Sequence, residues 1–324
     1  MTGQDEPLYN VAKRHYVDGA TMEAIAQELG VSRPTVSRML ARARESGIVR
    51  ITLAEPPGTD SPTARAIASA FGIEVHVVNV SSRMPVSTRL STVARHAAQL
   101  MTAMVNDYSS VGVAWGVTAW HVARALEPMN VSGVRVVQVN GSMQPRGTGL
   151  PYVGALLQTF ADALGHGTVI PFPVPAFFDQ PATRELMWQE RSVRSVLDQI
   201  RNLDVAVFGV GYPHAHVPSH VYTSGYIEPH DLTEALQAGA IGDVCTVLLR
   251  TDGSWEGLPM NDRSTGPTPE QLRSISRRLC VVGDHSRARA LLAALRAGVV
   301  TDLVCDSHTA RALHELLSRQ WTHD

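Results

Sequence analysis

The sequence predicts an α/β protein built from two unequal parts, a small helical unit at the N-terminus and a large body with a mainly parallel sheet. Residues 21–53, TMEAIAQELGVSRPTVSRMLARARESGIVRITL, have the pattern of two helices joined by a tight turn and followed by a β-rich run. Beyond them, short β-rich runs alternate with helical stretches, which is typical of a parallel sheet covered by helices on both faces. With 324 residues, the chain is long enough for one large domain and one small one.

The first helix of the pair is expected to begin after Thr21, a good N-cap residue. Ala24 stands where a capping box would need Glu or Gln, so that box is absent. Gly30 is expected to end the helix, because the turn there favours a positive φ. The apolar residues recur at helical spacing and are expected to face a small core: Met22, Ile25, Ala26 and Leu29. An earlier helix, at about residues 8–17, completes a core of three helices.

The second helix is expected to be capped by Ser32, with Pro34 in its first turn. Its inward stripe is Val36, Met39 and Leu40, and its outward face carries Arg33, Thr35, Ser37, Arg38 and Arg42, with Arg44 behind them. No acidic residue occurs within it before Glu45. Ser46 and Gly47 would stop this helix, and Ile48, Val49, Ile51 and Leu53 suggest a strand or wing.

This arrangement predicts a winged helix-turn-helix that reads the major groove of DNA. We predict a DNA-binding set of Ser32, Arg33, Thr35, Ser37, Arg38 and Arg42. Residues near the start of such a helix reach base edges or nearby phosphates, while later arginines such as Arg42 meet phosphate. The alternative is an ordinary surface hairpin whose arginines face solvent. The turn glycine, serine cap, arginine face and wing together favour DNA binding.

The composition of the chain limits the functions that it can have. The net charge of −2 gives no global basic field, so DNA association should depend on one patch and on pairing of protomers. We found no apolar run of membrane-spanning length and no signal peptide, which predicts a cytoplasmic protein without a membrane partner. Cys245, Cys280 and Cys305 are expected to be buried reduced thiols. Lys13 is the only lysine, so the body cannot use a lysine Schiff base, a lysine general base or a phosphate-loop lysine.

The stretch EPPGTDSP at residues 55–62 has the composition of a linker. We therefore predict a DNA-binding domain at 1–55, a linker at 56–62 and an effector-binding and oligomerisation domain at 63–324. The body's β-rich runs are residues 74–80, 109–115, 134–140, 167–172, 203–211, 243–249, 279–283 and 301–305. Its helical stretches lie at about 88–105, 118–126, 152–164, 193–200, 232–238, 288–297 and 309–317.

Ligands of such Rossmann-like sheets bind beyond the carboxyl ends of the strands, where helix N-termini offer free N–H groups. Several loops there carry glycine, hydroxyl or amide groups that suit a phosphate or a sugar. The predicted effector-binding residues are Gly116, Thr118, Asn140, Gly141, Ser142, Gly209, Gly211, Asp243 and Arg287. Each glycine alone is typical of a simple turn, but together the loops describe one site for an anion or polyol.

Other polar residues are open to two interpretations. His214, His216 and His220 have a spacing that could ligate a metal, but their segment contains no carboxylate. We therefore expect no metal there, and surface histidines or histidines bordering the pocket instead. Asp204, Asp252 and Asp306 also flank strands, where a carboxylate can act as a base, hold a sugar hydroxyl or cap a helix; capping is expected for Asp306. Trp115 and Trp120 are expected to pack, although Trp115 could stack on a sugar.

The chain resembles the SorC-type sugar-binding transcriptional regulators of bacteria along essentially its full length. The resemblance rests on ELGVSRPTVSRMLARARESGIVRI, VGVAWGVTAWHVARAL, VVQVNGS, DVAVFGVG, GAIGDVCTVLLRTDG and CVVGDHSRARALLAALRAGVVTDLVCDSHTARAL. It implies a winged helix-turn-helix joined to an effector domain related to sugar-phosphate isomerases, and oligomers that are often tetramers. It also implies effector loops at Gly116 with Thr118, Gly141 with Ser142, Gly209 with Gly211, Gly242 with Asp243, and Gly283 to Arg287.

Two residues depart from the family pattern. Asp284 stands where many relatives have glycine, and Val117 replaces a polar residue. Both make a strongly anionic ligand less comfortable, although Arg287 can still hold a phosphate.

The main hypothesis is a regulator of carbohydrate uptake or catabolism genes that binds operator DNA as a homotetramer. Its effector is a sugar, a polyol or, by preference, a sugar phosphate, and it needs no cofactor and has no catalytic residues. The alternative is a sugar-phosphate isomerase or deaminase with an accessory DNA-binding head. A third hypothesis is a DNA-binding scaffold whose body only oligomerises.

Overall fold

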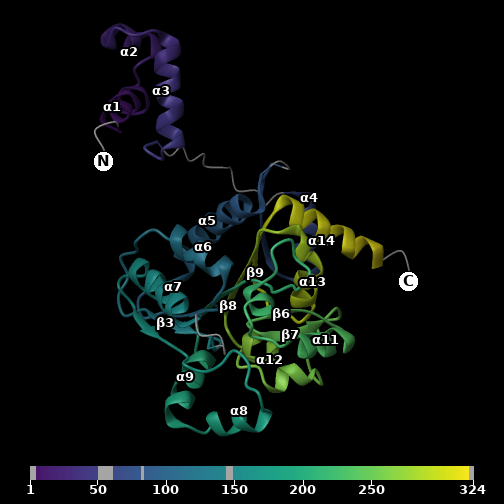
Figure 1. The fold of residues 1–324 in the computed structure, drawn as a ribbon. Coiled ribbons are helices and arrows are strands. Elements are labelled where there is room, and N and C mark those ends of the chain that lie inside the picture. Colours follow the sequence, from purple (N-terminus) through teal and green to yellow (C-terminus); the bar gives the residue numbers. More distant parts are fainter. Residues whose placement is uncertain (1–4, 50–60, 82–83, 144–148, 321–324) are drawn as a thin grey trace. The chain divides into compact units, whose positions relative to one another are not determined.

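We describe a computed structural model of the chain, which covers residues 5–49, 61–81, 84–143 and 149–320. The chain separates into two compact units, Met1–Pro56 and Pro57–Asp324. Figure 1 labels the elements of both units. Among the described residues, no helix is long and apolar enough to cross a membrane.

The N-terminal unit is a bundle of three helices, α1 (Asp5–Tyr16), α2 (Met22–Leu29) and α3 (Arg33–Glu45). Its core contains Leu8, Val11, Ala12, Ile25, Ala26, Val36, Leu40 and Ala43. The predicted boundaries of α2 are confirmed, because the Thr21 hydroxyl accepts a hydrogen bond from the N–H of Ala24 at 3.2 Å and Gly30 has a φ of 63°. The helix-turn-helix therefore follows from local sequence signals.

Four details of this unit add to or differ from the prediction. Leu29, in the last turn of α2, is 48% exposed and does not join the core. Ser32 makes no side-chain cap bond, since its Oγ lies 2.9 Å from the Thr35 Oγ1 instead. The arginine face has an acidic neighbour, because Glu23 on α2 places its Oε2 3.6 Å from the Arg33 Nε. Of the predicted wing, Ile48 and Val49 are not in a strand, while Ile51 and Leu53 lie outside the described residues.

The body contains a parallel sheet of seven strands in the order β1-β9-β8-β5-β2-β3-β4. These strands are β1 (Glu74–Val78), β2 (Ser110–Val113), β3 (Arg135–Gln138), β4 (Thr168–Ile170), β5 (Val205–Phe208), β8 (Arg277–Val282) and β9 (Asp302–Asp306). From β2 the chain adds β3 and β4 on one side, then returns to place β5 on the other side. A topological switch point therefore lies between β2 and β5, which is where sheets of this kind bind ligands.

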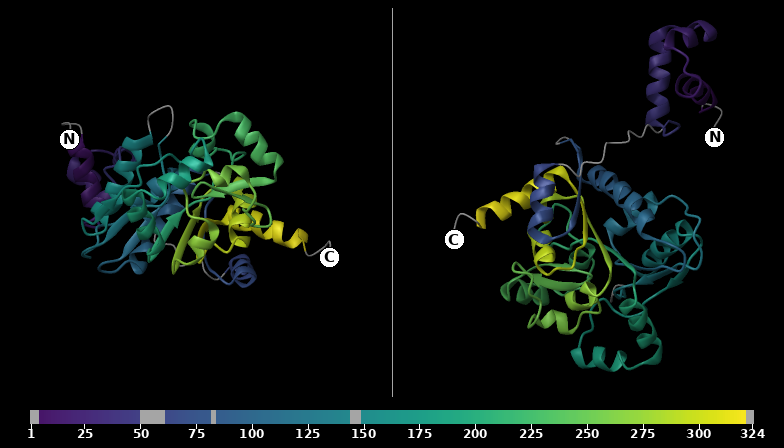
Figure 2. Two further views of the ribbon diagram at one scale, coloured as in Figure 1. Left: turned by 90° about the horizontal axis from the view of Figure 1, so that it is seen from below. Right: turned by 180° about the vertical axis from the view of Figure 1, so that it is seen from behind.

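Helices cover both faces of the sheet, as Figures 1 and 2 show. The larger helices are α4 (Pro62–Phe71), α5 (Val86–Met104), α6 (Val117–Ala125), α7 (Gly149–Ala163), α9 (Arg191–Arg201), α11 (Pro229–Gln237), α13 (Ala288–Arg296) and α14 (Ser307–Gln320). Shorter ones are α8 (Pro181–Met187), α10 (His220–Thr223), α12 (Pro269–Arg273), η1 (Pro259–Asp262) and η2 (His285–Arg287). The predicted mainly parallel α/β body is confirmed.

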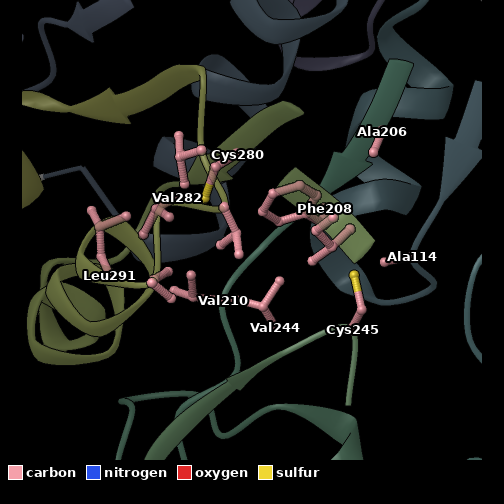
Figure 3. Close-up of a cluster of buried hydrophobic side chains, with 14 of the residues drawn as sticks. Ala114, Ala206, Phe208, Val210, Val244, Cys245, Cys280, Val282 and Leu291 are labelled. Carbon is pink, nitrogen blue, oxygen red and sulfur yellow. The ribbon is translucent and has the colours of Figure 1, made fainter. Parts of the chain in front are cut away.

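Alternate residues along the strands face two separate hydrophobic cores, because successive side chains of a strand point to opposite faces. In β5, Val205 and Val207 pack with α5, α6 and α7, whereas Ala206 and Phe208 pack with α4, α9 and α13. Figure 3 shows part of the second core, where Phe208 lies near Cys280, Val282, Leu291, Val244 and Cys245. All three cysteines are buried, as predicted. Burial raises the pKa of the Cys280 thiol to about 12, so this thiol is protonated at neutral pH.

Residues 243–249, predicted as one strand, instead span an antiparallel hairpin that pairs β6 (Ala240–Val244) with β7 (Val247–Arg250). The turn uses Cys245 and Thr246, whose φ values are 50° and 71°. The carboxylate of Asp243 stabilises it by accepting a hydrogen bond from the N–H of Thr246 at 3.0 Å. Neither turn residue is glycine or asparagine, so the usual sequence signal for this turn is missing.

The predicted linker is too long at its C-terminal end. Pro62 is the first residue of α4, and the hydroxyl of Ser61 caps this helix by accepting a hydrogen bond from the N–H of Ala64 at 3.0 Å. Residues 56–60 lie outside the described part of the chain. The sequence analysis also missed α4, α8 and α12.

Gly141→Ala is expected to lower the free energy of unfolding of the body by at least about 1–3 kcal/mol, the usual cost of overpacking. A Cβ at this position would lie 2.1 Å from the carbonyl oxygen of Pro175 and 2.4 Å from that of Val174, and backbone atoms cannot turn aside. Gly154→Ala is the matched control, because a Cβ there meets nothing within 4 Å and alanine favours a helix. Chemical denaturation would measure both; equal stability of the two variants would contradict this account of Gly141.

Candidate functional site

The outward face of α3 presents the predicted DNA-binding side chains. Ser32, Arg33, Ser37, Arg38 and Arg42 are exposed, and Thr35 is half-buried. The guanidinium of Arg38 lies 3.5 Å from the hydroxyl of Thr35, which leaves its other N–H groups available to a partner. Residues 38 and 42 are one helical turn apart and share a face. The face can therefore offer several cationic hydrogen-bond donors to a phosphate or a base edge.

A pocket of about 190 Å³ lies at the switch point of the body's sheet. Its walls come from the ends of β2, β5 and β8, the N-termini of α5 and α6, and the segment 217–221 that leads into α10. Seven of the nine predicted effector residues line it: Gly116, Thr118, Asn140, Gly209, Gly211, Asp243 and Arg287. The site predicted from separate loops is thus brought together by the sheet.

Gly141 and Ser142 do not line this pocket, contrary to prediction. The N–H of Gly141 donates to the hydroxyl of Thr265 at 3.0 Å, and its carbonyl accepts from the indole N–H of Trp115 at 2.8 Å. Ser142 is fully buried, and its hydroxyl accepts a hydrogen bond from the Gln138 amide at 3.1 Å. Through these hydrogen bonds, the two residues stabilise the wall behind the pocket.

Asp243 is the most constrained polar group of the pocket. The hydroxyl of Tyr222 donates to its Oδ1 at 2.7 Å, and its Oδ2 accepts the turn bond from Thr246. Burial raises the pKa of this carboxyl group, although both hydrogen bonds oppose the rise. Gly211 makes the arrangement possible, because a Cβ there would lie 1.7 Å from the Asp243 Oδ1.

Asn140 contributes an acceptor that is not used within the described protein. Its side chain is only 2% exposed, and its Oδ1 has no hydrogen-bond partner among the described residues. A buried amide oxygen without a partner costs about 1–3 kcal/mol. A ligand hydroxyl in the pocket would remove that cost.

Arg287 holds the segment that closes one side of the pocket. Its Nη1 donates to the carbonyl of Val210 and the hydroxyl of Ser219, and its Nη2 donates to the carbonyl of Val217, each at 2.7 Å. Burial lowers the pKa of this guanidinium, and the charges of Asp284 and Asp243 oppose that shift. The prediction that Arg287 can hold a phosphate therefore needs a change. Its guanidinium already donates hydrogen bonds to three groups of the protein, so a phosphate would have to share it with them.

Other residues singled out in the sequence are dispersed. His220 lines the pocket, His216 contacts Asp284, and exposed His214 packs its ring against Tyr212 at 5.7 Å. Trp115 lines the pocket and packs against Tyr226, and Trp120 packs against Tyr152. The capping role of Asp306 is confirmed, since it accepts from the N–H groups of His308 and Thr309. Asp204 accepts a hydrogen bond from the N–H of Ser110, and Asp252 from that of Ser254.

Sequence analysis missed several lining residues. Ser87 and Leu90 come from α5, and His121 comes from the middle of α6. Val217 and Pro218 come from the segment before α10. None follows a strand directly, so the rule that located the other residues could not find them.

An exposed arginine-bearing helix of a helix-turn-helix and a separate α/β body, whose pocket at the switch point contains several polar groups, define a DNA-binding regulator with a ligand-binding domain. Comparison with known proteins supports this class of protein. A family model described as "Putative sugar-binding domain" matches residues 58–315, and one described as "Homeodomain-like domain" matches residues 11–51. The chain belongs to the family of sugar-binding transcriptional regulators.

Individual relatives are similar to this chain over most of their length. The deoxyribonucleoside regulator of Bacillus subtilis is 28% identical over 305 residues, which cover 93% of this chain and 95% of the relative. A domain of "a possible sugar-binding transcriptional regulator" from Arthrobacter aurescens TC1 is 40% identical, with a TM-score of 0.74 over 81% of this chain and all of that chain. The full-length sorbitol operon regulator SorC of Klebsiella pneumoniae shares the fold, with a TM-score of 0.73 and 23% identity over 97% of this chain and all of that one.

Proposed function

We propose that a sugar, polyol or sugar phosphate binds the pocket at the switch point and thereby changes the affinity of the helix-turn-helix for operator DNA. The single observation that carries this proposal is the pocket itself. The unpartnered Asn140 oxygen, Thr118 and the N-terminus of α6 line the same pocket, so hydroxyl donors and an anionic or polar oxygen would both find partners there. The relatives named for deoxyribonucleosides, sorbitol and erythritol support ligands of this chemical class.

The regulated genes would serve carbohydrate uptake or catabolism, and the protein would act in the cytoplasm, where its operator DNA is. The active form would be a homo-oligomer, because paired recognition helices match half-sites about one helical turn apart. The preference for a tetramer comes from the resemblance to SorC-type regulators alone. The effector must bind one arrangement of the DNA-binding units better than the other, since only a difference in affinity can shift their equilibrium.

The pocket is proposed to bind its ligand without chemical conversion. The body has no lysine to act as a base or to form a Schiff base. The carboxylate of Asp243 is fixed by bonds from Tyr222 and Thr246. Incubation of the protein with sugar phosphates would test this, and turnover would instead support an isomerase or deaminase.

A thermal-shift screen of sugars, polyols and their phosphates tests the proposed ligand class. A ligand that binds only the folded state at 100 times its Kd stabilises it by about 2.7 kcal/mol, which raises Tm by roughly 5–10 °C for a body of this size. Asn140→Leu should abolish the shift, because it keeps the branching at Cγ but removes the oxygen acceptor. Failure of every compound would contradict the proposal and favour a body that only oligomerises.

The identity of the ligands that bind would also report on Arg287. If ligands that carry a phosphate bind, then the Arg287 guanidinium, which also holds the loop, or the N–H groups at the start of α6 must donate hydrogen bonds to the anion. Binding by neutral polyols alone would mean that Arg287 keeps its loop contacts and that Asp284 marks a pocket adapted to uncharged ligands.

A further inference from the structure

We propose that His216, Asp284 and His285 form a binding site for a divalent transition-metal ion, of which Zn²⁺ is the best fit, at the rim of the pocket. One ligand atom from each of the three residues lies within 4.8 Å of the others. His216 comes from the segment between β5 and α10, while Asp284 and His285 directly follow β8. Because β5 and β8 are neighbours in the sheet, their carboxyl ends bring the two segments together.

The fold brings a carboxylate close to the histidine segment. His214, His216 and His220 have no carboxylate near them in the sequence, which argued against a metal there. Asp284 lies 68 residues further along, yet its Oδ1 is 3.3 Å from the His216 Nδ1. Two imidazoles and a carboxylate are a common ligand set for zinc and related ions.

The distances suit a tetrahedral ion. Metal–ligand bonds of about 2.0–2.2 Å place neighbouring ligand atoms roughly 3.3–3.5 Å apart. The 3.3 Å between the His216 Nδ1 and the Asp284 Oδ1 matches that edge and is long for a charge-assisted hydrogen bond. All three ligand atoms lie within 4.8 Å of one another, so small side-chain adjustments would bring them to one ion.

Two buried atoms of these residues have no hydrogen-bond partner among the described residues. They are the Asp284 Oδ2 and the His285 Nδ1. Asp284 is only 5% exposed, whereas an ordinary surface carboxylate would be solvated. A bound ion is one of the few explanations for unpaired polar atoms in this setting.

The charge balance of the cluster permits a cation. Asp284 brings a carboxylate to the two imidazoles, and the N–H of Ser286 holds it by donating to its Oδ1 at 3.0 Å. Arg287 opposes a second cation, yet its Nε is 3.9 Å from the carboxylate and its Nη atoms are directed to the loop carbonyls and Ser219.

An ion at this site would have a structural consequence for the pocket. Three protein ligands leave the fourth tetrahedral position open. Asp284 also lines the pocket, so an oxygen of a pocket ligand could take that position. The ion would also tie the segment containing His216 to the β8–α13 connection, alongside the bonds that Arg287 makes to Val217 and Ser219.

Titration of the full chain with Co²⁺ and Zn²⁺ tests the site. We expect one Co²⁺ per chain with the strong visible absorption of a four-coordinate ion, and competition by Zn²⁺. His216→Ala and His285→Ala should each weaken binding by at least about tenfold, because removal of a group that merely supports a ligand already costs that much. His214→Ala is the matched control, since this exposed histidine of the same segment lies outside the cluster and should leave affinity unchanged.

His216 is exposed, so His216→Ala should fold normally, and equal Tm values without metal would verify this. Equal affinity of wild type and both cluster variants would overturn the proposal and assign binding to other histidines. Absence of binding at micromolar metal concentrations would overturn it as well. The sugar screen is performed once with chelator and once with Zn²⁺, so a failure of the metal site and a failure of the proposed ligand class can be told apart.

Discussion

Arg38→Ala is expected to abolish specific operator binding. An arginine that contacts a guanine bidentately contributes about 1–3 kcal/mol of discrimination, and two copies on paired half-sites double that to about 2–6 kcal/mol. Operator affinity should therefore fall by roughly 30-fold to 10⁴-fold. Arg38 is suited to this role because it is exposed on α3 and its one described side-chain contact, to the Thr35 hydroxyl, is long at 3.5 Å. Gel-shift titrations at fixed salt would measure the loss.

Arg44→Ala is the matched control for Arg38→Ala. It removes the same charge from the same helix but from behind the predicted DNA-contacting face. A modest loss that shrinks at higher salt is expected, because a general electrostatic contribution is screened. Equal losses in the two variants would mean that α3 contributes only charge, and an unchanged affinity in Arg38→Ala would remove this residue from the recognition surface.

Arg287→Ala should eliminate the response to effector while the helix-turn-helix still binds operator. The guanidinium holds Val210, Val217 and Ser219, which form one side of the pocket, and it lies beside the buried carboxylate of Asp284. Removing one partner of a buried charged pair costs about 3–5 kcal/mol. We therefore expect a lower Tm for the body and no ligand-induced shift. Operator binding measured with and without effector would be identical.

Two further variants separate the possible roles of Arg287. Arg289→Ala changes an exposed arginine two residues further along, in α13, and should alter neither Tm nor the effector response. Arg287→Lys keeps the charge but loses the planar fork that bridges three loop groups. If it restores binding of a phosphorylated ligand, the charge matters more than the loop contacts. If effector binding survives in Arg287→Ala, this residue does not belong to the site.

The sequence predicted best where the determinants are local. The N-cap hydroxyl of Thr21 and the left-handed Gly30 act within one turn of helix, and the alternation of strands and helices follows from burial of each strand on both faces. The carboxyl ends of parallel strands meet at one edge, which is why most of the predicted effector loops line a single pocket.

Prediction failed where a distant contact decides the outcome. The β6–β7 hairpin turns at Cys245 and Thr246 without a glycine, with Asp243 bonded across the turn, so its sequence resembled one continuous strand. Gly141 follows a strand like the other loop glycines, but backbone carbonyls from residues 174 and 175 pack against it and make it part of the wall. The pairing of His216 with Asp284 likewise depends on which strands are neighbours.

The exposed position of Lys13 on α1 has a practical consequence, because no other lysine exists in the chain. An amine-reactive fluorophore would attach to this side chain, or to an N-terminal amine, and leave the whole ligand-binding body unmodified. Its emission would then report on the rotation and surroundings of the helix-turn-helix alone. Effector titrations followed in this way would observe the movement of the DNA-binding units without a dye disturbing the pocket.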